Sequence, residues 1–107
     1  MALPSYFRGQ QIPTFSPYTK EPIDSKTDAV KYILQKYRYD TPISNWEFVE
    51  ELKAFRFQDI IFRLRHNEEW EIETVRGKNP GHFVYWLKHH PDDNENYQQT
   101  IMMDTPI

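Results

Sequence analysis

The chain has 107 residues, which is enough for one domain with a modest core. It contains no cysteine, which excludes disulfides, thiolate metal sites and cysteine nucleophiles and fits a reducing cytoplasm. No apolar run approaches the roughly 20 residues that span a bilayer. The first stretch, MALPSYFRGQQ, lacks the basic and apolar regions of a secretory signal. These features predict a cytoplasmic protein without a membrane partner.

The net charge of −3 is unevenly distributed along the chain. Residues 1–24 are neutral, residues 25–88 carry a net +1, and residues 89–107 carry a net −4. The acidity therefore lies at the C-terminal end. The central part can present a local basic face despite the negative total.

The two ends differ in composition from the centre. Residues 1–24 contain four prolines, which disfavour helices and interior strands, together with several large apolar side chains. This combination predicts an extended, aromatic arm that lies either on the domain or on a partner. Residues 89–107 are polar and acidic with little periodicity, which predicts a disordered tail. The folded domain is then expected within 25–88.

A first helix is predicted over 26–38. Ser25 and Thr27 are both plausible N-caps, and Asp28 lies in the first turn, where the helix dipole favours an acid. Apolar side chains follow at helical spacing. Pro42 disfavours a helical residue before it and ends the segment.

A second helix is predicted over 45–52, because Ser44 and Glu47 form a capping box pattern. Ile43 is placed to pack against Phe48 as a hydrophobic staple. The residues expected to face inward are Trp46, Phe48, Val49 and Leu52.

A third helix is predicted over 56–66. The inward face of the second helix, continued in a straight line, would meet Lys53 and Arg56, so the apolar stripe breaks near Lys53-Ala54-Phe55. A complete stripe then restarts at Phe57, Ile60, Ile61 and Leu64. The preferred interpretation is two helices with a turn. One continuous helix that changes its buried face is the alternative, because the turn has no glycine.

A β-hairpin is predicted after the third helix. WEIETVR alternates in the manner of a strand, GKNPG at 77–81 is a glycine-bounded turn, and HFVYWLK is rich in β-prone residues. The order helix, extended link, helix, turn, helix, hairpin predicts an α+β fold of the winged helix-turn-helix type.

Residues 41–87 also resemble the small winged helix-turn-helix proteins of bacteriophages. The stretches that carry the resemblance are ISNWEFVEEL, FRFQDIIFRLR and IETVRGKNPGHFVYWL. Two departures are Lys53-Ala54-Phe55, where such proteins usually have a small residue or glycine, and Ile60, where they tend to have a basic or small residue. The resemblance implies DNA binding in a bacterial host cytoplasm.

The candidate DNA-binding side chains lie off the apolar face of the third helix and at the hairpin turn. Arginine can bind guanine edges or phosphates, and glutamine can pair with adenine. A basic hairpin tip can contact the phosphate backbone. Asp59, Glu68 and Glu69 oppose this interpretation, since they repel phosphate. The candidates are Arg56, Gln58, Arg63, Arg65, His66, Arg76 and Lys78.

Other chemistry is not indicated. Most large aromatic side chains, among them Trp46, Trp70, Trp86, Phe57, Phe83 and Tyr85, are expected in the core rather than stacked on bases. His89-His90 and the two aspartates after them have metal-binding atoms but no spacing that fixes a site. No catalytic, cofactor or metal motif is present, so no enzyme is predicted.

Two functions from different classes remain open. The first is a double-stranded DNA-binding protein of phage or prophage type, acting as a small regulator or accessory factor. The second is a protein-interaction factor on the same scaffold, which would bind a host or phage polymerase or nuclease through its N-terminal arm or acidic tail.

Overall fold

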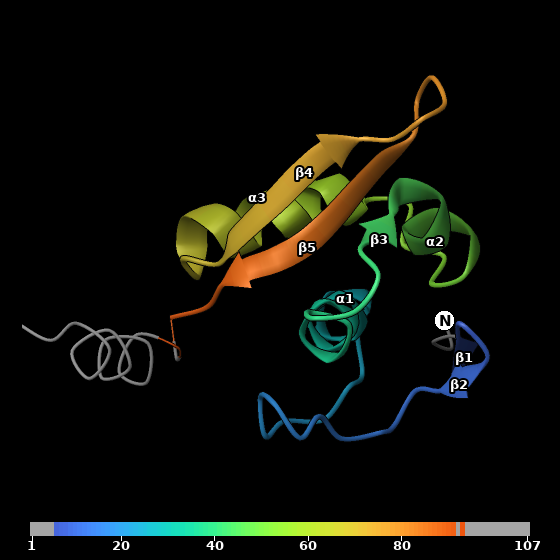
Figure 1. The fold of residues 1–107 in the computed structure, drawn as a ribbon. Coiled ribbons are helices and arrows are strands. Elements are labelled where there is room, and N and C mark those ends of the chain that lie inside the picture. The colour runs from blue at the N-terminus through green and yellow to red at the C-terminus, as the bar shows by residue number, and fades with distance from the viewer. Residues whose placement is uncertain (1–5, 92, 94–107) are drawn as a thin grey trace, which may run out of the picture.

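The computed structural model of the protein describes residues 6–91 and 93, which form an α+β domain with three helices and two antiparallel sheets (Figure 1). In chain order the elements are β1 (Tyr6–Phe7), β2 (Gln10–Gln11), α1 (Lys26–Lys36), β3 (Ile43–Ser44), α2 (Asn45–Glu50), α3 (Phe57–Asn67), β4 (Glu71–Arg76) and β5 (Phe83–His89).

The first helix, α1, begins where the sequence predicts. Ser25 is the N-cap, and its side chain accepts a hydrogen bond from the Asp28 amide. The helix ends at Lys36, two residues earlier than predicted, because the chain turns at Tyr37 and the Asp40 amide donates to the Tyr37 carbonyl. Its buried face includes Val30, Ile33 and Leu34.

The capping box of α2 is also confirmed. The Glu47 amide donates to the Ser44 hydroxyl, and the Ser44 amide donates to the Glu47 carboxylate. Phe48 and Leu52 are fully buried, as predicted. The inward placement of Trp46 was wrong: it is 50% exposed, because Phe48 occupies the inward side of this short helix.

The break between α2 and α3 is confirmed, so the interpretation as one continuous helix is wrong. Lys53 takes over the role of the missing glycine, with a left-handed backbone at φ +56°. The Ala54 amide returns to the Phe48 carbonyl at 2.9 Å, and Lys26 Nζ donates to the Leu52 carbonyl at 2.7 Å. The predicted stripe of α3 is buried in full.

The main sheet has the order β3-β5-β4, with antiparallel neighbours. β4 and β5 form the predicted hairpin, in which Arg76 pairs with Phe83. The turn depends on Gly77, because a Cβ atom there would lie 2.0 Å from the His82 ring. A side chain at this position would therefore force the His82 ring out of its place against the turn.

The core is rich in aromatic rings at the junction of α2, α3 and the sheet. Phe48 stacks on Phe57 at a centroid distance of 5.0 Å, and both rings meet Tyr85 edge-on at 5.8 and 5.6 Å. The expectation that the large aromatics are buried is confirmed for Phe57, Trp70 and Tyr85, while Phe83 and Trp86 are only half-buried.

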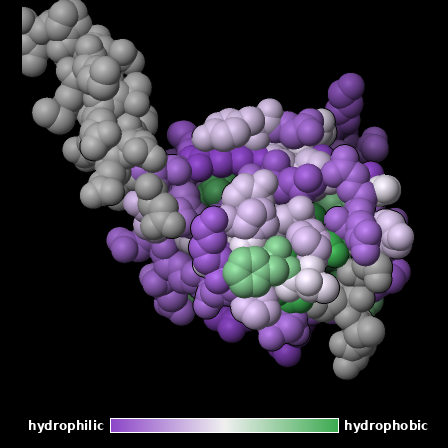
Figure 2. Space-filling model, turned by 90° about the horizontal axis from the view of Figure 1, so that it is seen from below, coloured by the Kyte–Doolittle hydropathy of each residue, from purple (hydrophilic) through white to green (hydrophobic). Residues whose placement is uncertain are grey.

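The N-terminal segment, residues 6–24, lies along the domain beside α1 (Figure 1). Phe7 is 1% exposed and contacts the ring of Tyr37, and Ile23 is also buried. The core therefore includes side chains from before residue 25. Seen from below, the side on which this segment lies in Figure 1, the molecular surface is mostly hydrophilic with a small central hydrophobic area (Figure 2).

Most of the acidic tail, residues 92 and 94–107, lies outside the described residues, and so does the predicted disorder of that tail. The described part of it packs on the domain. His89 ends β5, the His90 ring meets Trp70 at 4.7 Å, and Arg38 forms an ion pair with Asp93.

Candidate nucleic-acid interface

The structure places four of the seven predicted DNA-binding residues on α3, one at the N-cap of that helix and two on the hairpin. Arg56 is the N-cap of α3, with an 87% exposed side chain, and the others on this helix are exposed as well. Their environments differ, however, and this separates side chains that are open to a ligand from side chains that already have partners.

Arg65 is held by the sheet. Its Nη2 donates to the Ile72 carbonyl at 2.6 Å and to the Thr74 hydroxyl at 2.7 Å, and its Nε donates to the same carbonyl at 3.1 Å. The guanidinium therefore fixes α3 against β4. A base or phosphate would have to compete with these three hydrogen bonds.

His66 is held less firmly. Its ring lies 4.2 Å from the ring of Phe62, one turn earlier on the helix. Gln58 lies on the exposed surface of the first turn. Both can reach a ligand on the outer face of α3.

Arg76 and Lys78 lie at the far end of the hairpin, which projects past α2 (Figure 1). Asn45 ties this end of the hairpin to α2: its Nδ2 donates to the Gly81 carbonyl at 2.9 Å, and its Oδ1 accepts from the Phe83 amide at 3.0 Å. The two cations therefore lie on a hairpin whose position relative to α2 is fixed.

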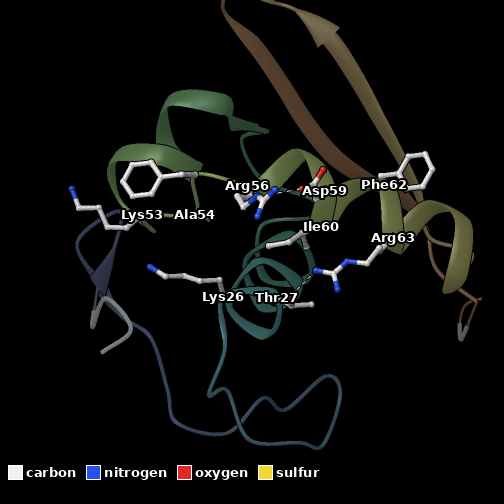
Figure 3. Close-up of a pocket in the computed structure, with 10 residues that line it drawn as sticks. Lys26, Thr27, Lys53, Ala54, Arg56, Asp59, Ile60, Phe62 and Arg63 are labelled. Carbon is white, nitrogen blue, oxygen red and sulfur yellow. Dashed lines mark hydrogen bonds and ion pairs between the residues drawn. The ribbon is translucent and has the colours of Figure 1, made fainter. Parts of the chain in front are cut away.

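An open groove of about 680 Å³ lies between the first turn of α1, the α2–α3 turn and the outer side of α3. We call it the basic groove. Figure 3 shows side chains from all three segments around it. It is lined by Lys26, Thr27, Lys53, Ala54, Phe55, Arg56, Asp59, Ile60, Phe62 and Arg63.

The charges of the basic groove are unbalanced. Its lining includes four cations, Lys26, Lys53, Arg56 and Arg63, and one carboxylate, Asp59, which leaves a net charge of +3. Partial burial, and then the positive charge of Lys53, hold the pKa of Lys26 below its ordinary value. An anion in the groove would relieve this repulsion.

Lys26 Nζ already donates to the Leu52 carbonyl at 2.7 Å, whereas the other three groove cations have weak partners or none among the described residues. Arg56 and Asp59 form an exposed ion pair at 3.5 Å, and Arg63 Nη2 lies 3.5 Å from the Thr27 hydroxyl (Figure 3). Within residues 6–91 and 93, Lys53 has no ion-pair partner. Arg56, Arg63 and Lys53 are therefore available to a ligand at little cost, since exposed pairs contribute about 0–1 kcal/mol.

The sequence pointed to only two of the groove residues, Arg56 and Arg63. Lys26 and Lys53 were missed because the groove joins segments that are distant in sequence. Phe55 and Phe62, which are 71% and 60% exposed, could have been noticed as large rings off the apolar stripe of α3. Arg76 and Lys78 do not line the groove.

Comparisons with models of known protein families, with curated proteins and with solved structures gave no significant match. Across the described part of the chain, no helix has the length and apolar character needed to cross a membrane. The functional interpretation therefore rests on the residues and geometry of the chain itself.

Proposed function

We propose that this protein is a non-enzymatic, DNA-binding winged-helix protein of phage or prophage type, a small regulator or accessory factor in the bacterial cytoplasm. The observation that carries the proposal is the groove of net charge +3 on the outer side of α3, in a chain whose total charge is −3. A polyanion is the partner that such a local reversal of charge favours.

The fold supports this proposal. The element order from α1 to β5 and the sheet order β3-β5-β4 are compatible with a winged helix-turn-helix. In such a domain the second helix of the motif enters the major groove of DNA. Here that helix is α3, whose outer face carries Gln58, Arg63 and His66.

The contacts divide by their chemistry. Gln58 and Arg63 can reach base edges, where each good bidentate contact discriminates by about 1–3 kcal/mol. Arg56, Arg76 and Lys78 lie at the start of α3 and at the hairpin end, where phosphate contacts that position the protein are expected. Arg65 supports the site by holding α3 against β4.

A binding experiment with a labelled DNA duplex of mixed sequence tests the proposal. We expect binding at low salt that weakens steeply toward physiological salt, and a large loss in the double variant Arg56→Ala/Arg63→Ala. Lys36→Ala is the control. It removes a cation from the C-terminal end of α1, about 15 Å along the helix axis from Lys26 and the basic groove. No binding by the parent at low salt would refute the proposal.

The second candidate, a protein-interaction factor, is favoured by one observation. Three large rings near α2 and α3, Trp46, Phe55 and Phe62, are at least half exposed, and aromatic side chains are enriched in protein interfaces. A pull-down from bacterial lysate with parent protein and with Phe55→Ala/Phe62→Ala tests this candidate. Stable recovery of one protein that the variant loses, without any duplex binding, would favour it over DNA.

A further inference from the structure

The basic groove combines positive charge with exposed aromatic rings, which duplex binding alone does not explain. The bases of a duplex are stacked on each other, so their faces are closed to a phenyl ring. An unpaired base offers its face, and stacking on an aromatic side chain then binds it without regard to sequence.

The two rings lie at different ends of the groove. Phe55 belongs to the α2–α3 turn, next to Ala54, while Phe62 lies more than one helical turn into α3. Figure 3 shows Phe62 near the Arg63 end and Lys53 at the opposite end. Both rings are more than half exposed, so each keeps a large apolar surface in contact with water.

The cations lie between and beside the rings. Lys26 lies between the two ends of the groove, Arg63 lies toward the Phe62 end, and Lys53 and Arg56 belong to the α2–α3 turn (Figure 3). The groove also lies at the N-terminal ends of α1 and α3, and α3 has no side-chain cap. The positive ends of the two helix dipoles add to the attraction of the cations for phosphate.

We propose that the basic groove binds a short single-stranded segment of nucleic acid, with Phe55 and Phe62 stacking on unpaired bases and Lys26, Lys53, Arg56 and Arg63 contacting its phosphates. This goes beyond the proposed function, because it names an unpaired strand as ligand and assigns the rings a role. It also holds if the outer face of α3 does not enter a duplex.

The Asp59 carboxylate opposes phosphate binding in the groove and therefore offers a variant that should bind more tightly. It is the one carboxylate of the lining, and its ion pair with Arg56 at 3.5 Å is exposed. A phosphate at Arg56 would replace this weak pair. Asp59→Asn should therefore strengthen the binding of a single strand, while a variant that only altered the fold would weaken it.

The test uses the full chain and labelled oligothymidine, oligouridine and a duplex in parallel binding measurements. We expect oligothymidine to bind, and Phe55→Ala and Phe62→Ala each to weaken that binding about 5-fold or more while duplex binding changes much less. Oligouridine shows whether a 2′-hydroxyl is tolerated, which distinguishes DNA from RNA as the source of the strand.

Tyr39→Ala is the matched control, because Tyr39 is a 90% exposed ring that does not line the groove. It should bind oligothymidine as the parent does. Thermal unfolding of each variant checks that the fold is kept, which the exposure of both phenylalanines leads us to expect.

Three outcomes would overturn the proposal: no binding of either oligonucleotide by the parent, equal binding by the parent and both phenylalanine variants, or full displacement of oligothymidine by inorganic polyphosphate at equal phosphate concentration. The last would mean that charge alone is bound. Duplex binding with loss of the single-strand effect would leave the proposed function intact and reject only this inference.

Discussion

Arginine side chains have opposite environments on two sides of this domain. In the N-terminal segment, Arg8 donates to the Glu47 carboxylate at 2.8 Å and to the carbonyls of Thr41 and Pro42 at 3.0 and 2.8 Å. Its guanidinium also lies 4.8 Å from the centre of the Tyr37 ring. In the basic groove, by contrast, Arg63 has one long contact to Thr27 and Arg56 is 87% exposed.

The difference separates side chains that stabilise the fold from side chains that can bind a ligand. Arg8 and Glu47 are mostly buried, so removing either would leave charged or polar groups without partners. Arg56 and Arg63 are hydrated in the free protein, so they contribute little to folding and lose little when a phosphate replaces their water. The same residue type thus serves structure on one side and is available for binding on the other.

The largest effect is expected for Arg8→Met. Methionine keeps part of the packing against Phe7 and Tyr37 but loses every hydrogen bond of the guanidinium. It also leaves the Glu47 carboxylate without its cation. We expect the free energy of unfolding to fall by about 2–3 kcal/mol, measured by urea denaturation.

Arg63→Met is the matched variant on the open side, and its free energy of unfolding should stay within about 0.5 kcal/mol of the parent. Equal losses in the two variants would erase the distinction between the two sides. Binding should show the reverse pattern, with the duplex affected by the change at Arg63 and not by the change at Arg8.

The contact between Arg8 and Glu47 should also make the stability of the protein depend on pH in the acid range. Burial alone would raise the pKa of this carboxyl, but hydrogen bonds from Arg8 and from the Ser44 amide outweigh burial and hold the pKa below its ordinary value of 4.5. A carboxyl with a lowered pKa stabilises the fold fully above its unfolded-state value. That contribution is lost as the pH falls below 4.5 and through the folded-state pKa.

The stability difference between the parent and Arg8→Met should therefore be largest near neutral pH and shrink as the pH is lowered to about 3. Urea denaturation of both proteins over this pH range measures it. A difference that stays constant with pH would mean that Arg8 acts through packing alone and not through the Glu47 carboxylate.

The sequence predicted what local patterns decide. The caps at Ser25 and Ser44 and the stripe of α3 depend on residues within one or two helical turns, and the structure has all of them. The exposure of Arg56 and Arg63 could also be predicted. Charged side chains opposite an apolar stripe face solvent, whichever element the stripe packs against.

Long-range partners were not predictable in this way. Arg8 contacts Glu47 across 39 positions, and no periodicity links them. The place of Lys26 in the basic groove could not be predicted either, because α1 and the α2–α3 turn meet only in the folded chain. Arg65 looked as free as Arg63 in sequence, but the side of α3 that carries it faces β4.

Arg65→Ala tests whether Arg65 stabilises the fold, as Arg8 does, or is available for binding, as Arg63 is. Loss of its bonds to Ile72 and Thr74 should lower the free energy of unfolding by about 1 kcal/mol. Arg63→Ala, two positions away on the same helix, is the control and should be neutral. A neutral result for Arg65→Ala with a strong loss of duplex binding would move Arg65 to the binding side.

The smallest effect on stability, and the sharpest on salt dependence, is expected for Arg76→Ala. Arg76 lies at the end of β4, in the part of the hairpin that Asn45 holds against α2, so its side chain is presented from a fixed position. A phosphate contact there releases about one counterion, and its loss should lower the slope of log K against log salt by about 0.9 for a duplex. The affinity should fall similarly for all sequences, because a phosphate contact reads no base. The free energy of unfolding should change by less than about 0.5 kcal/mol.

Lys36→Ala, which removes the same charge from the far end of α1, should leave the slope unchanged. An unchanged slope in Arg76→Ala as well would confine any nucleic-acid contact to α3 and the basic groove, and would remove the hairpin from the binding side of the molecule.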